Sequence, residues 1–420
     1  KTRRVLLENI GAFGAIQIIN YILPLITFPY LVRVLGPEKY GLVSFALSFV
    51  TYFMIFVAYG FEYSATREIS LSRNNKDRLS EIFSSVMLSK ILLIFLSLVL
   101  MSVIVFSFER FRQEWLLYLM TFGMVIGYAS IPNWFFQGVE NVKFITVSHF
   151  VGQLVYVIAV FVFIRSQSDY YLVQFFNSVG LLVCGVILIF SALRFYGIRL
   201  FIPSRHQIVQ QMKEGRDFFI LSLLTQSYNV SNILILGLIL GEIYAGYYYA
   251  AERIVNMVLS LLSLPTTRAF FPYMSKVAKE SKERGLKIVW KLSFVVGLIA
   301  FFISVILFVS ADLIVKALLG DEYSNSVNIL RFLSFLVFVK GLSGVFITQG
   351  LLAFGLEHIV VRIMLVVTIF HITLAITFTK FFSIFGNVIS VCITEVLLAF
   401  LSIKNFIRIT SISFSNNEKK

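Results

Sequence analysis

The sequence predicts an all-α integral membrane protein with twelve transmembrane helices, arranged as two pseudo-symmetric six-helix lobes around a central cavity. The first observation is the composition: hydrophobic residues make up 58% of the 420 and charged residues only 14%, against about 25% charged residues in soluble domains. The second is a series of apolar stretches of spanning length, roughly 20 residues each. The third is a repeated motif that divides the chain into halves.

The repeated motif occupies residues 35–46 and returns at 240–251. Both copies read Leu-Gly, four residues, Gly, four residues, Ala. The first glycines of the two copies, Gly36 and Gly241, are 205 positions apart (241 − 36), close to half of the chain. We interpret the motif as the mark of a duplicated unit, in which the first two helices of each half meet at an equivalent corner.

The spans are expected to be helices, because the apolar stretches do not alternate as barrel strands do. A window of about 19 residues predicts twelve spans, near residues 10–32, 41–62, 84–107, 115–136, 144–164, 172–193, 217–239, 246–270, 292–311, 332–354, 359–379 and 387–404. Trp115, Trp134 and Trp290 fall at predicted span ends, as interfacial tryptophans do.

Two lobes are expected, an N-terminal lobe at residues 1–203 and a C-terminal lobe at 204–420, each with six spans. Residues 194–216 mix apolar and charged side chains and are predicted to form an amphipathic cytoplasmic connector between them. Lys and Arg are concentrated in the even-numbered connections, with dense runs at 67–78 and 276–291. Because cytoplasmic loops retain positive charge, both termini are predicted to lie in the cytoplasm.

The formal net charge of +14 does not indicate a nucleic-acid-binding protein. Membrane orientation and attraction to anionic lipid account for it, so the lipid bilayer is the expected partner and nucleic acid is not. Cys184 and Cys392 both lie in apolar stretches, which argues against a disulfide framework or a CxxC metal site. We expect no cofactor and no metal.

Polar side chains at helical spacing mark one face of the first two spans in each half. In the first spans the positions are Gln17, Asn20, Pro24 and Thr27, and at the offset of the repeat Ser222, Thr225, Asn229 and Asn232, all of them polar except Pro24. In the second spans they are Ser44, Ser48 and Thr51, and at the same offset Tyr249, Arg253 and Asn256. Such groups either hydrogen-bond to neighbouring helices or line a water-filled cavity. Their alignment across both halves favours the cavity, the place where transporters built of two related halves bind substrate.

Cationic residues within the spans indicate what this cavity would hold. Arg253 lies on the polar face and Lys340 near the middle of its span, so an anionic group, phosphate or carboxylate, is the expected guest. Lys90 is a further intramembrane cation, although a lysine near a span margin can also snorkel. The candidate substrate-binding residues are Arg253, Lys340, Gln17, Asn20, Ser48, Thr225, Asn229, Asn232, Tyr249, Asn256 and Lys90.

Three acidic residues, Glu62, Glu252 and Glu395, also lie within or near spans. Glu252 and Glu395 either pair with Arg253 or Lys340, or one of them carries a proton for coupling. These three are the candidates for ion coupling.

Enzymatic functions find little support in the sequence. The chain has no G-x-x-x-x-G-K-[ST] for a built-in ATPase, and its four histidines are scattered without H-E-x-x-H or a nucleophile elbow. A glycan polymerase would be expected to carry a sizeable outside loop with polar catalytic residues, and no connection here is long enough. We therefore predict that the protein is not an enzyme.

Several local strings resemble those of one transporter family. They are Leu35-Gly36-Pro37 with Tyr40-Gly41, Gly60-Phe61 before Thr66-Arg67-Glu68-Ile69, Lys90, Phe136-Gln137-Gly138 before Lys143, and Gly246-Tyr247-Tyr248 before Ala251 and Arg253. With them the whole chain resembles the polysaccharide transporter branch of the multidrug/oligosaccharidyl-lipid/polysaccharide (MOP) exporter superfamily, and specifically the O-antigen flippases of the Wzx type.

The resemblance implies a flippase of lipopolysaccharide biosynthesis in the bacterial inner membrane. Such proteins move an undecaprenyl-diphosphate-linked oligosaccharide from the cytoplasmic to the periplasmic leaflet by alternating access, through a cationic central cavity. The implied partners are this lipid-linked glycan and the glycan polymerase and chain-length machinery. Twelve predicted spans, rather than fourteen, argue against the related lipid II flippase.

Two other classes of function remain open from the sequence. An ion-coupled small-molecule exporter of the multidrug kind would be expected to have an acidic cavity for organic cations. A membrane scaffold of a glycan assembly complex would not need its cavity residues.

Overall fold

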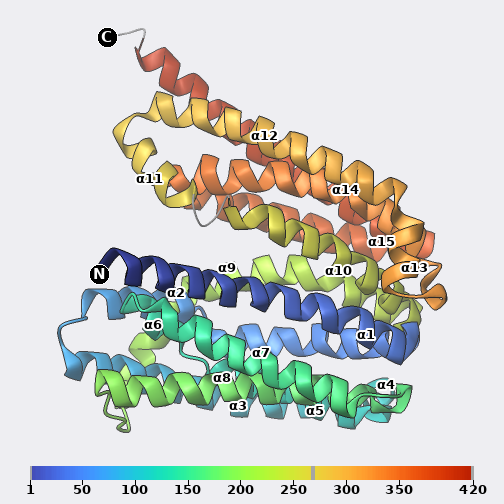
Figure 1. Cartoon of the computed structure of the whole chain (residues 1–420), viewed down its shortest axis with the longest axis horizontal. Helices are drawn as coiled ribbons and strands as arrows, with labels where there is room; N and C mark the ends of the chain where they lie inside the picture. Colours follow the sequence, from blue (N-terminus) through green and yellow to red (C-terminus); the bar gives the residue numbers. More distant parts are fainter. Residues whose placement is uncertain (1, 266–269, 418–420) are drawn as a thin grey trace. The chain divides into compact units, whose positions relative to one another are not determined.

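The computed structural model describes residues 2–265 and 270–417, and it describes side chains for these residues except at positions 2–22, 24, 263–265, 272, 279 and 409–417. The chain folds into helices joined by short connections (Figure 1). Two compact units divide it, residues 1–230 and residues 231–420. The division falls inside one helix, α9 (Arg205–Leu240), so the predicted lobe boundary at 203/204 stays a prediction.

Unit 1 is a helical bundle built from the first half of the chain. Its elements are α1 (Thr2–Ala58), α2 (Phe61–Leu71), α3 (Lys76–Ser107), α4 (Glu109–Gln113), α5 (Trp115–Ser130), α6 (Asn133–Gly138), α7 (Val142–Phe163), η1 (Gln167–Asp169), α8 (Tyr170–Tyr196) and the first part of α9. Helix α5 packs against α8, α1 and α3, and α7 packs against α8 and α1 (Figure 1). The short helices α2 and α6 pack on each other.

Unit 2 is a second bundle, which contains the rest of α9. Its further elements are α10 (Glu242–Pro265), α11 (Phe271–Glu280), α12 (Lys282–Val309), α13 (Ala311–Leu318), η3 (Asp321–Tyr323), α14 (Ser326–Val345), the π-helical turn η4 (Phe346–Leu351), η5 (Leu352–Phe354) and α15 (Glu357–Asn417). Figure 1 shows α12, α14 and α15 side by side, and α14 packs against both of its neighbours and against α10.

The repeated motif marks a corner in each unit, as predicted. Gly36 interrupts α1 with a φ of 67° and a ψ of 171°, and Gly241 separates α9 from α10 with a φ of 108°. Positive φ is strained for residues with a Cβ and accessible to glycine. Both copies thus place glycine where the backbone must leave one helix and begin the next.

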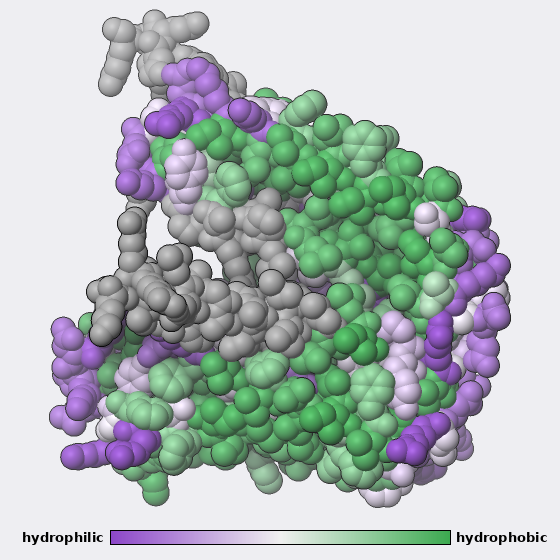
Figure 2. All heavy atoms as spheres, viewed as in Figure 1, coloured by the Kyte–Doolittle hydropathy of each residue, from purple (hydrophilic) through white to green (hydrophobic). Residues whose placement is uncertain are grey.

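Among the described residues, nine helical stretches are long and apolar enough to cross a membrane. Two of them are far longer than one span, Leu25–Leu71 and Glu357–Arg408, and they contain the breaks at Gly36 and Ser383. Figure 2 shows hydrophobic residues along the helices and hydrophilic residues gathered toward the helix ends. The protein is therefore an all-helical, multi-pass membrane protein.

Helix α9 begins at Arg205, well before the predicted span at 217–239. Ser204 starts it with a reciprocal cap, in which Gln207 Oε1 accepts from the Ser204 N–H at 2.7 Å and Ser204 Oγ accepts from the Gln207 N–H at 3.3 Å. This is the capping-box arrangement. The second half of the predicted connector is thus the first part of a helix that continues without a break to Leu240.

Within unit 1, a polar network ties the beginning of α9 to α2 and α3. Gln211 Nε2 donates to both carboxylate oxygens of Glu68 on α2, each at 3.1 Å. On α3, Arg78 Nη2 lies 3.4 Å from Glu68 Oε2, and Arg78 Nη1 lies 2.6 Å from Glu81 Oε1. Beside this network Gly60 and Gly215 approach so closely that a Cβ at Gly60 would lie 2.6 Å from the Gly215 carbonyl oxygen. The start of α9 is therefore fixed to α2 and α3.

Trp134 differs from the predicted interfacial tryptophan. Its side chain is fully buried and packs against Phe83 and Phe135. The reason is a break at Ile131 and Pro132, which ends α5 and begins the short α6. Trp115 and Trp290 remain about half exposed, at 47% and 44%.

Candidate functional site

A cavity of about 500 Å³ with both polar and apolar walls lies within unit 2, among α10, α12 and α14. Its polar lining comes from Asn256 and Ser260 on α10, Lys340 on α14 and Thr348 in the following π-helical turn. Gly344, one turn after Lys340, leaves open space where a side chain would begin. The structure therefore brings together two of the predicted site residues, Asn256 and Lys340, in one hollow.

Lys340 is held in the cavity wall by an ion pair. Its Nζ lies 3.0 Å from Glu395 Oε1 on α15, and the exposed fractions of the two side chains are 26% and 2%. The ammonium group has three N–H donors, so one can serve Glu395 while others face the cavity. The sequence left open whether Glu395 pairs with a cation or carries a proton. In the structure it forms an ion pair with Lys340.

Glu252 adds a second carboxylate to this cluster from α10. It accepts a hydrogen bond from Tyr248 at 3.2 Å and lies close enough to Lys340 and Arg253 to interact with both charges. Arg253 is half-buried and precedes Asn256 and Ser260 by three and seven positions, which places all three on one helix face. Lys340 therefore interacts with two carboxylates, and Arg253 lies next to one of them, although Arg253 itself is not among the residues that line the cavity.

Further buried polar groups lie on α15, where they join the part before Ser383 to the part after it. His371 is buried, with its Nδ1 3.3 Å from Thr394 Oγ1, and it interacts electrostatically with Lys340. Asn387 donates to Thr379 Oγ1 at 3.1 Å. A buried polar interior in a helical membrane unit is costly and typically functional, so this interior belongs with the candidate site.

The predicted polar faces receive mixed support. Gln17 and Asn20 lie outside the residues whose side chains the structure describes. Ser48 is buried and donates to the Ser44 carbonyl at 2.9 Å. Thr225 is half-buried and donates to the Leu221 carbonyl at 2.9 Å. Both hydroxyls therefore bond within their own helices.

The remaining predicted residues on the α9 and α10 faces differ in exposure. Asn229 is exposed and Tyr249 half-buried. Asn232 is buried, and its Oδ1 has no hydrogen-bond partner within the described part of the chain. Their roles as substrate contacts stay predictions.

Lys90 and Glu62 form a separate charged site inside unit 1. Lys90 is buried on α3 and its Nζ donates to the Ala129 carbonyl at 3.4 Å. Glu62, the first acidic residue of α2, lies close enough to interact electrostatically with Lys90. The burial of Lys90 leaves its ammonium group inside the bundle, where it interacts with the carboxylate of Glu62.

Gly344, Thr348 and His371 are site residues that the sequence reasoning did not find. Gly344 and Thr348 follow Lys340 by four and eight positions, so small and polar residues at helical spacing from the intramembrane lysine were the available signal. His371 gave no such signal, because a lone histidine in an apolar stretch has no partner nearby in the sequence.

Ion pairs outside the spans are of a different kind. Arg73 Nη2 lies 2.7 Å from Glu140 Oε1, and Lys316 Nζ lies 2.9 Å from Asp312 Oδ2, and each of the four side chains is more than a third exposed. The hydrogen bond from Arg73 lowers the pKa of the Glu140 carboxyl, and the hydrogen bond to Asp312 raises the pKa of the Lys316 ammonium group. Exposed pairs of this kind contribute little to stability, unlike the buried cluster around Lys340.

The fold is shared with solved transporter structures. The chain superposes on "Lipid II flippase MurJ, inward closed conformation" with a TM-score of 0.75 and 14% identity, covering 96% of this chain and 90% of that one. It superposes on an inward-facing multidrug resistance MATE family transporter of the MOP superfamily with a TM-score of 0.71 and 13% identity, covering 93% and 95%. At such identities the likeness concerns the fold alone.

The sequence relatives of the chain are also named as transporters. The chain is 30% identical over 394 residues to "Putative O-antigen transporter" of Escherichia coli (strain K12), covering 94% of this chain and 95% of the relative. It is 26% identical over 399 residues to a protein of the same name from Shigella dysenteriae, covering 94% and 99%. These comparisons confirm the predicted class, a membrane transporter rather than an enzyme. A family model described as "Polysaccharide biosynthesis protein" matches residues 6–278, and the chain belongs to this family.

Proposed function

We propose that the protein is a flippase that moves an undecaprenyl-diphosphate-linked oligosaccharide from the cytoplasmic to the periplasmic leaflet of a bacterial inner membrane. The observation that carries the proposal is the hollow in unit 2, whose wall combines the Lys340 ammonium group with amide and hydroxyl groups. The ammonium group can bind a diphosphate, and the amide and hydroxyl groups can hydrogen-bond to a glycan. Relatives named as O-antigen transporters, matched over nearly their whole length, support the same choice.

The proposed architecture has twelve spans in two lobes around a central cavity. Breaks at Gly36 and Ser383 would divide two of the nine long stretches into pairs, and α10, which has the length of a span, would be the twelfth. We place both termini in the cytoplasm because of the distribution of Lys and Arg, and the lobe boundary near 203/204 because the repeat divides the chain near its middle. The transport cycle would expose the cavity to each side in turn.

In the proposed site, Lys340 and Arg253 bind the diphosphate. Lys340 keeps N–H donors beside its contact with Glu395, and phosphate oxygens accept charge-assisted hydrogen bonds from such groups. Asn256, Ser260 and Thr348 offer donors and acceptors to the sugar hydroxyls. Because Glu395 competes with the diphosphate for Lys340, binding and release of substrate are linked to that carboxylate.

The driving force follows from charge. Moving one elementary charge across 100 mV is worth about 2.3 kcal/mol, so an inside-negative potential favours outward movement of a diphosphate. Glu252 and Glu395 are our candidates for coupling to an ion, because protonation of either would release Lys340 or Arg253 to the substrate. Glu62, beside Lys90, is the corresponding candidate in unit 1.

Filling the cavity at Gly344 tests the proposal. A side chain there meets open space at its Cβ, so Gly344→Trp should enter the cavity while the helix packing stays intact. We expect at least a tenfold loss of leaflet crossing for Gly344→Trp in proteoliposomes that contain undecaprenyl-diphosphate-linked oligosaccharide, measured by the access of a membrane-impermeant glycosidase to the glycan.

Gly344→Ala is the matched control, because a methyl group fits the same space and alanine favours helix. It should transport within about twofold of the unsubstituted protein, and both variants should keep its melting temperature. If folded Gly344→Trp transports at the normal rate, the substrate does not pass through this cavity. Loss of multidrug export with no effect on the glycan would favour an ion-coupled small-molecule exporter.

A further inference from the structure

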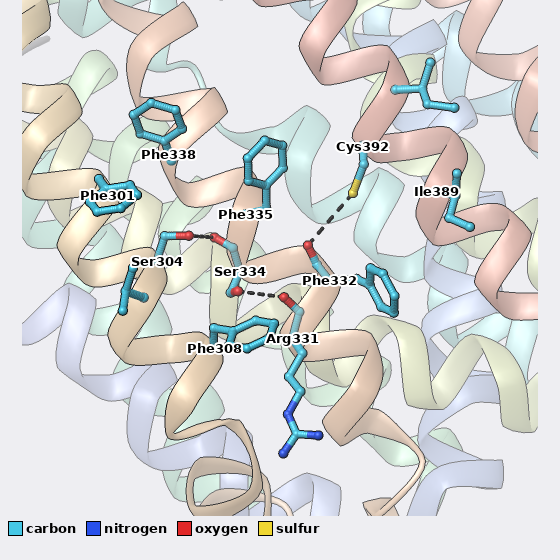
Figure 3. Close-up of a pocket in the computed structure, with 12 residues that line it drawn as sticks. Phe301, Ser304, Phe308, Arg331, Phe332, Ser334, Phe335, Phe338, Ile389 and Cys392 are labelled. Atoms are coloured by element: carbon cyan, nitrogen blue, oxygen red, sulfur yellow. Dashed lines mark hydrogen bonds between the residues drawn. The ribbon is translucent and has the colours of Figure 1, made fainter.

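A second hollow in unit 2 has a different character from the cavity beside Lys340. It is an open groove of about 620 Å³ between α12, α14 and α15, lined by five phenylalanines together with valine, isoleucine and Cys392 (Figure 3). The five aromatic residues are Phe301, Phe308, Phe332, Phe335 and Phe338. The groove therefore fits an apolar guest.

The walls of the groove belong to helices that are long and apolar enough to span the membrane. Its side chains are unusually exposed for hydrophobic residues, with Phe308 at 53%, Phe332 at 50% and Phe335 at 45%. Apolar surface of this kind on a spanning helix is covered by lipid chains. The groove is thus a depression in the lipid-facing surface.

The polar atoms in the groove are already bonded within the protein. Ser304 Oγ donates to the Ser334 carbonyl at 2.7 Å, Ser334 Oγ donates to the Arg331 carbonyl at 2.7 Å, and Cys392 Sγ lies 3.9 Å from the Phe332 carbonyl (Figure 3). These bonds leave few groups to recognise a sugar or a drug with polar substituents. A hydrocarbon chain needs no hydrogen-bond partner and can pack against the apolar side chains of the groove.

One charged residue, Arg331, stands at the end of the groove. Figure 3 shows its guanidinium group extending away from the phenyl rings of Phe335 and Phe338. Asn328 Oδ1 accepts from its Nη1 at 3.2 Å, and among the described residues no carboxylate lies within ion-pair distance of it. An arginine near the membrane margin has several donors left for an anion, and its planar fork suits a phosphate.

The spacing along α14 matches a lipid with a phosphate head group. Arg331 lies near the start of α14, and Phe335 and Phe338 follow at four and seven positions. With a rise of 1.5 Å per residue, the phenylalanines extend about 10 Å from the arginine along the helix axis. A phosphate held at Arg331 would therefore place the first part of an acyl chain along the groove.

We propose that this groove is a binding site for an anionic membrane phospholipid, with its phosphate on Arg331 and one acyl chain against the five phenylalanines. Bulk phospholipid contacts the outer surface of these helices continuously and outnumbers any carrier lipid, so mass action favours it as the occupant. The site adjoins the Lys340–Glu395 pair, because Cys392 in the groove precedes Glu395 by less than one turn of α15. The inference does not depend on the proposed transport activity.

Native mass spectrometry of the full-length protein tests the site. Detergent-solubilised protein is titrated with phosphatidylglycerol, with phosphatidylcholine of the same acyl chains, and with undecaprenyl phosphate. We expect unsubstituted protein to retain phosphatidylglycerol in preference to phosphatidylcholine, and Arg331→Gln to lose about tenfold in affinity for phosphatidylglycerol. The matched control is Lys380→Gln, which removes an exposed cation at the end of another membrane segment and should leave the preference unchanged.

A second variant keeps the test independent of the arginine. Val305 is 43% exposed and lines the groove, so Val305→Trp should fill the groove and lower the retention of both phospholipids. Equal loss in Lys380→Gln and Arg331→Gln would mean general electrostatic attraction and would overturn the site. Unchanged retention in both Arg331→Gln and Val305→Trp would do the same, and stronger retention of undecaprenyl phosphate would assign the groove to the carrier lipid.

Discussion

The ammonium group of Lys340 is the most informative single group in the molecule. Its position near the middle of a predicted span indicates that it needs a partner, because an unpaired charge inside a membrane is costly. The sequence cannot choose that partner, since Glu252 and Glu395 are both far away along the chain and only the packing of α10 and α15 on α14 brings them near. The structure contains the 3.0 Å pair with Glu395 and leaves Lys340 partly exposed to the cavity.

Substitution of this pair separates its structural role from its proposed transport role. Glu395→Ala alone leaves a largely buried cation without its partner, a loss that costs about 3–5 kcal/mol in buried pairs. We expect a clear fall in melting temperature, toward the lower end of that range because Lys340 is partly exposed.

The double variant Lys340→Met with Glu395→Leu replaces both charges by apolar groups and should recover most of the melting temperature. Transport of lipid-linked oligosaccharide should remain lost, because the proposed phosphate ligand is gone. A stable double variant that transports normally would show that Lys340 has a structural role only.

At the scale of elements, the corners are the best-predicted feature. A repeated Leu-Gly pattern predicts a corner, and the positive φ of Gly36 and Gly241 gives its physical reason. The break at Ser383 lies in the predicted connection between the spans at 359–379 and 387–404, but its φ of 57° could not be predicted, because a serine in an apolar stretch carries no signal for left-handed backbone. The early start of α9 had a signal in the sequence, since Ser204 and Gln207 have the spacing of a capping box.

Gly241→Ala measures how much the corner depends on glycine. A Cβ at this position meets nothing within 4 Å, so any cost comes from the backbone conformation alone. Strained backbone of this kind costs on the order of 1–3 kcal/mol, and we expect a lower melting temperature by thermal unfolding in detergent. Gly344 lies in the last turn of α14 and is not among the glycines with positive φ, so Gly344→Ala should be neutral or slightly stabilising. An equal effect of the two substitutions would contradict the role given to Gly241.

At the scale of the whole molecule, composition and span length determine the class of protein but not the site. A chain with 58% hydrophobic residues and repeated spanning stretches has few alternatives to a helical membrane protein. The contacts of the site depend on which helices pack together, and that information is not local. The alignment of polar residues across the repeat predicted Asn256 at the cavity, whereas Ser48 and Thr225 bond to their own helices.

The most direct measurement of the central claim is leaflet crossing of undecaprenyl-diphosphate-linked oligosaccharide in proteoliposomes of the unsubstituted protein, with and without an imposed membrane potential. We predict crossing well above that of protein-free liposomes, acceleration when the compartment from which the substrate leaves is negative, and no movement of organic cations. Crossing equal to that of protein-free liposomes, from protein that is folded and correctly inserted, would contradict the account.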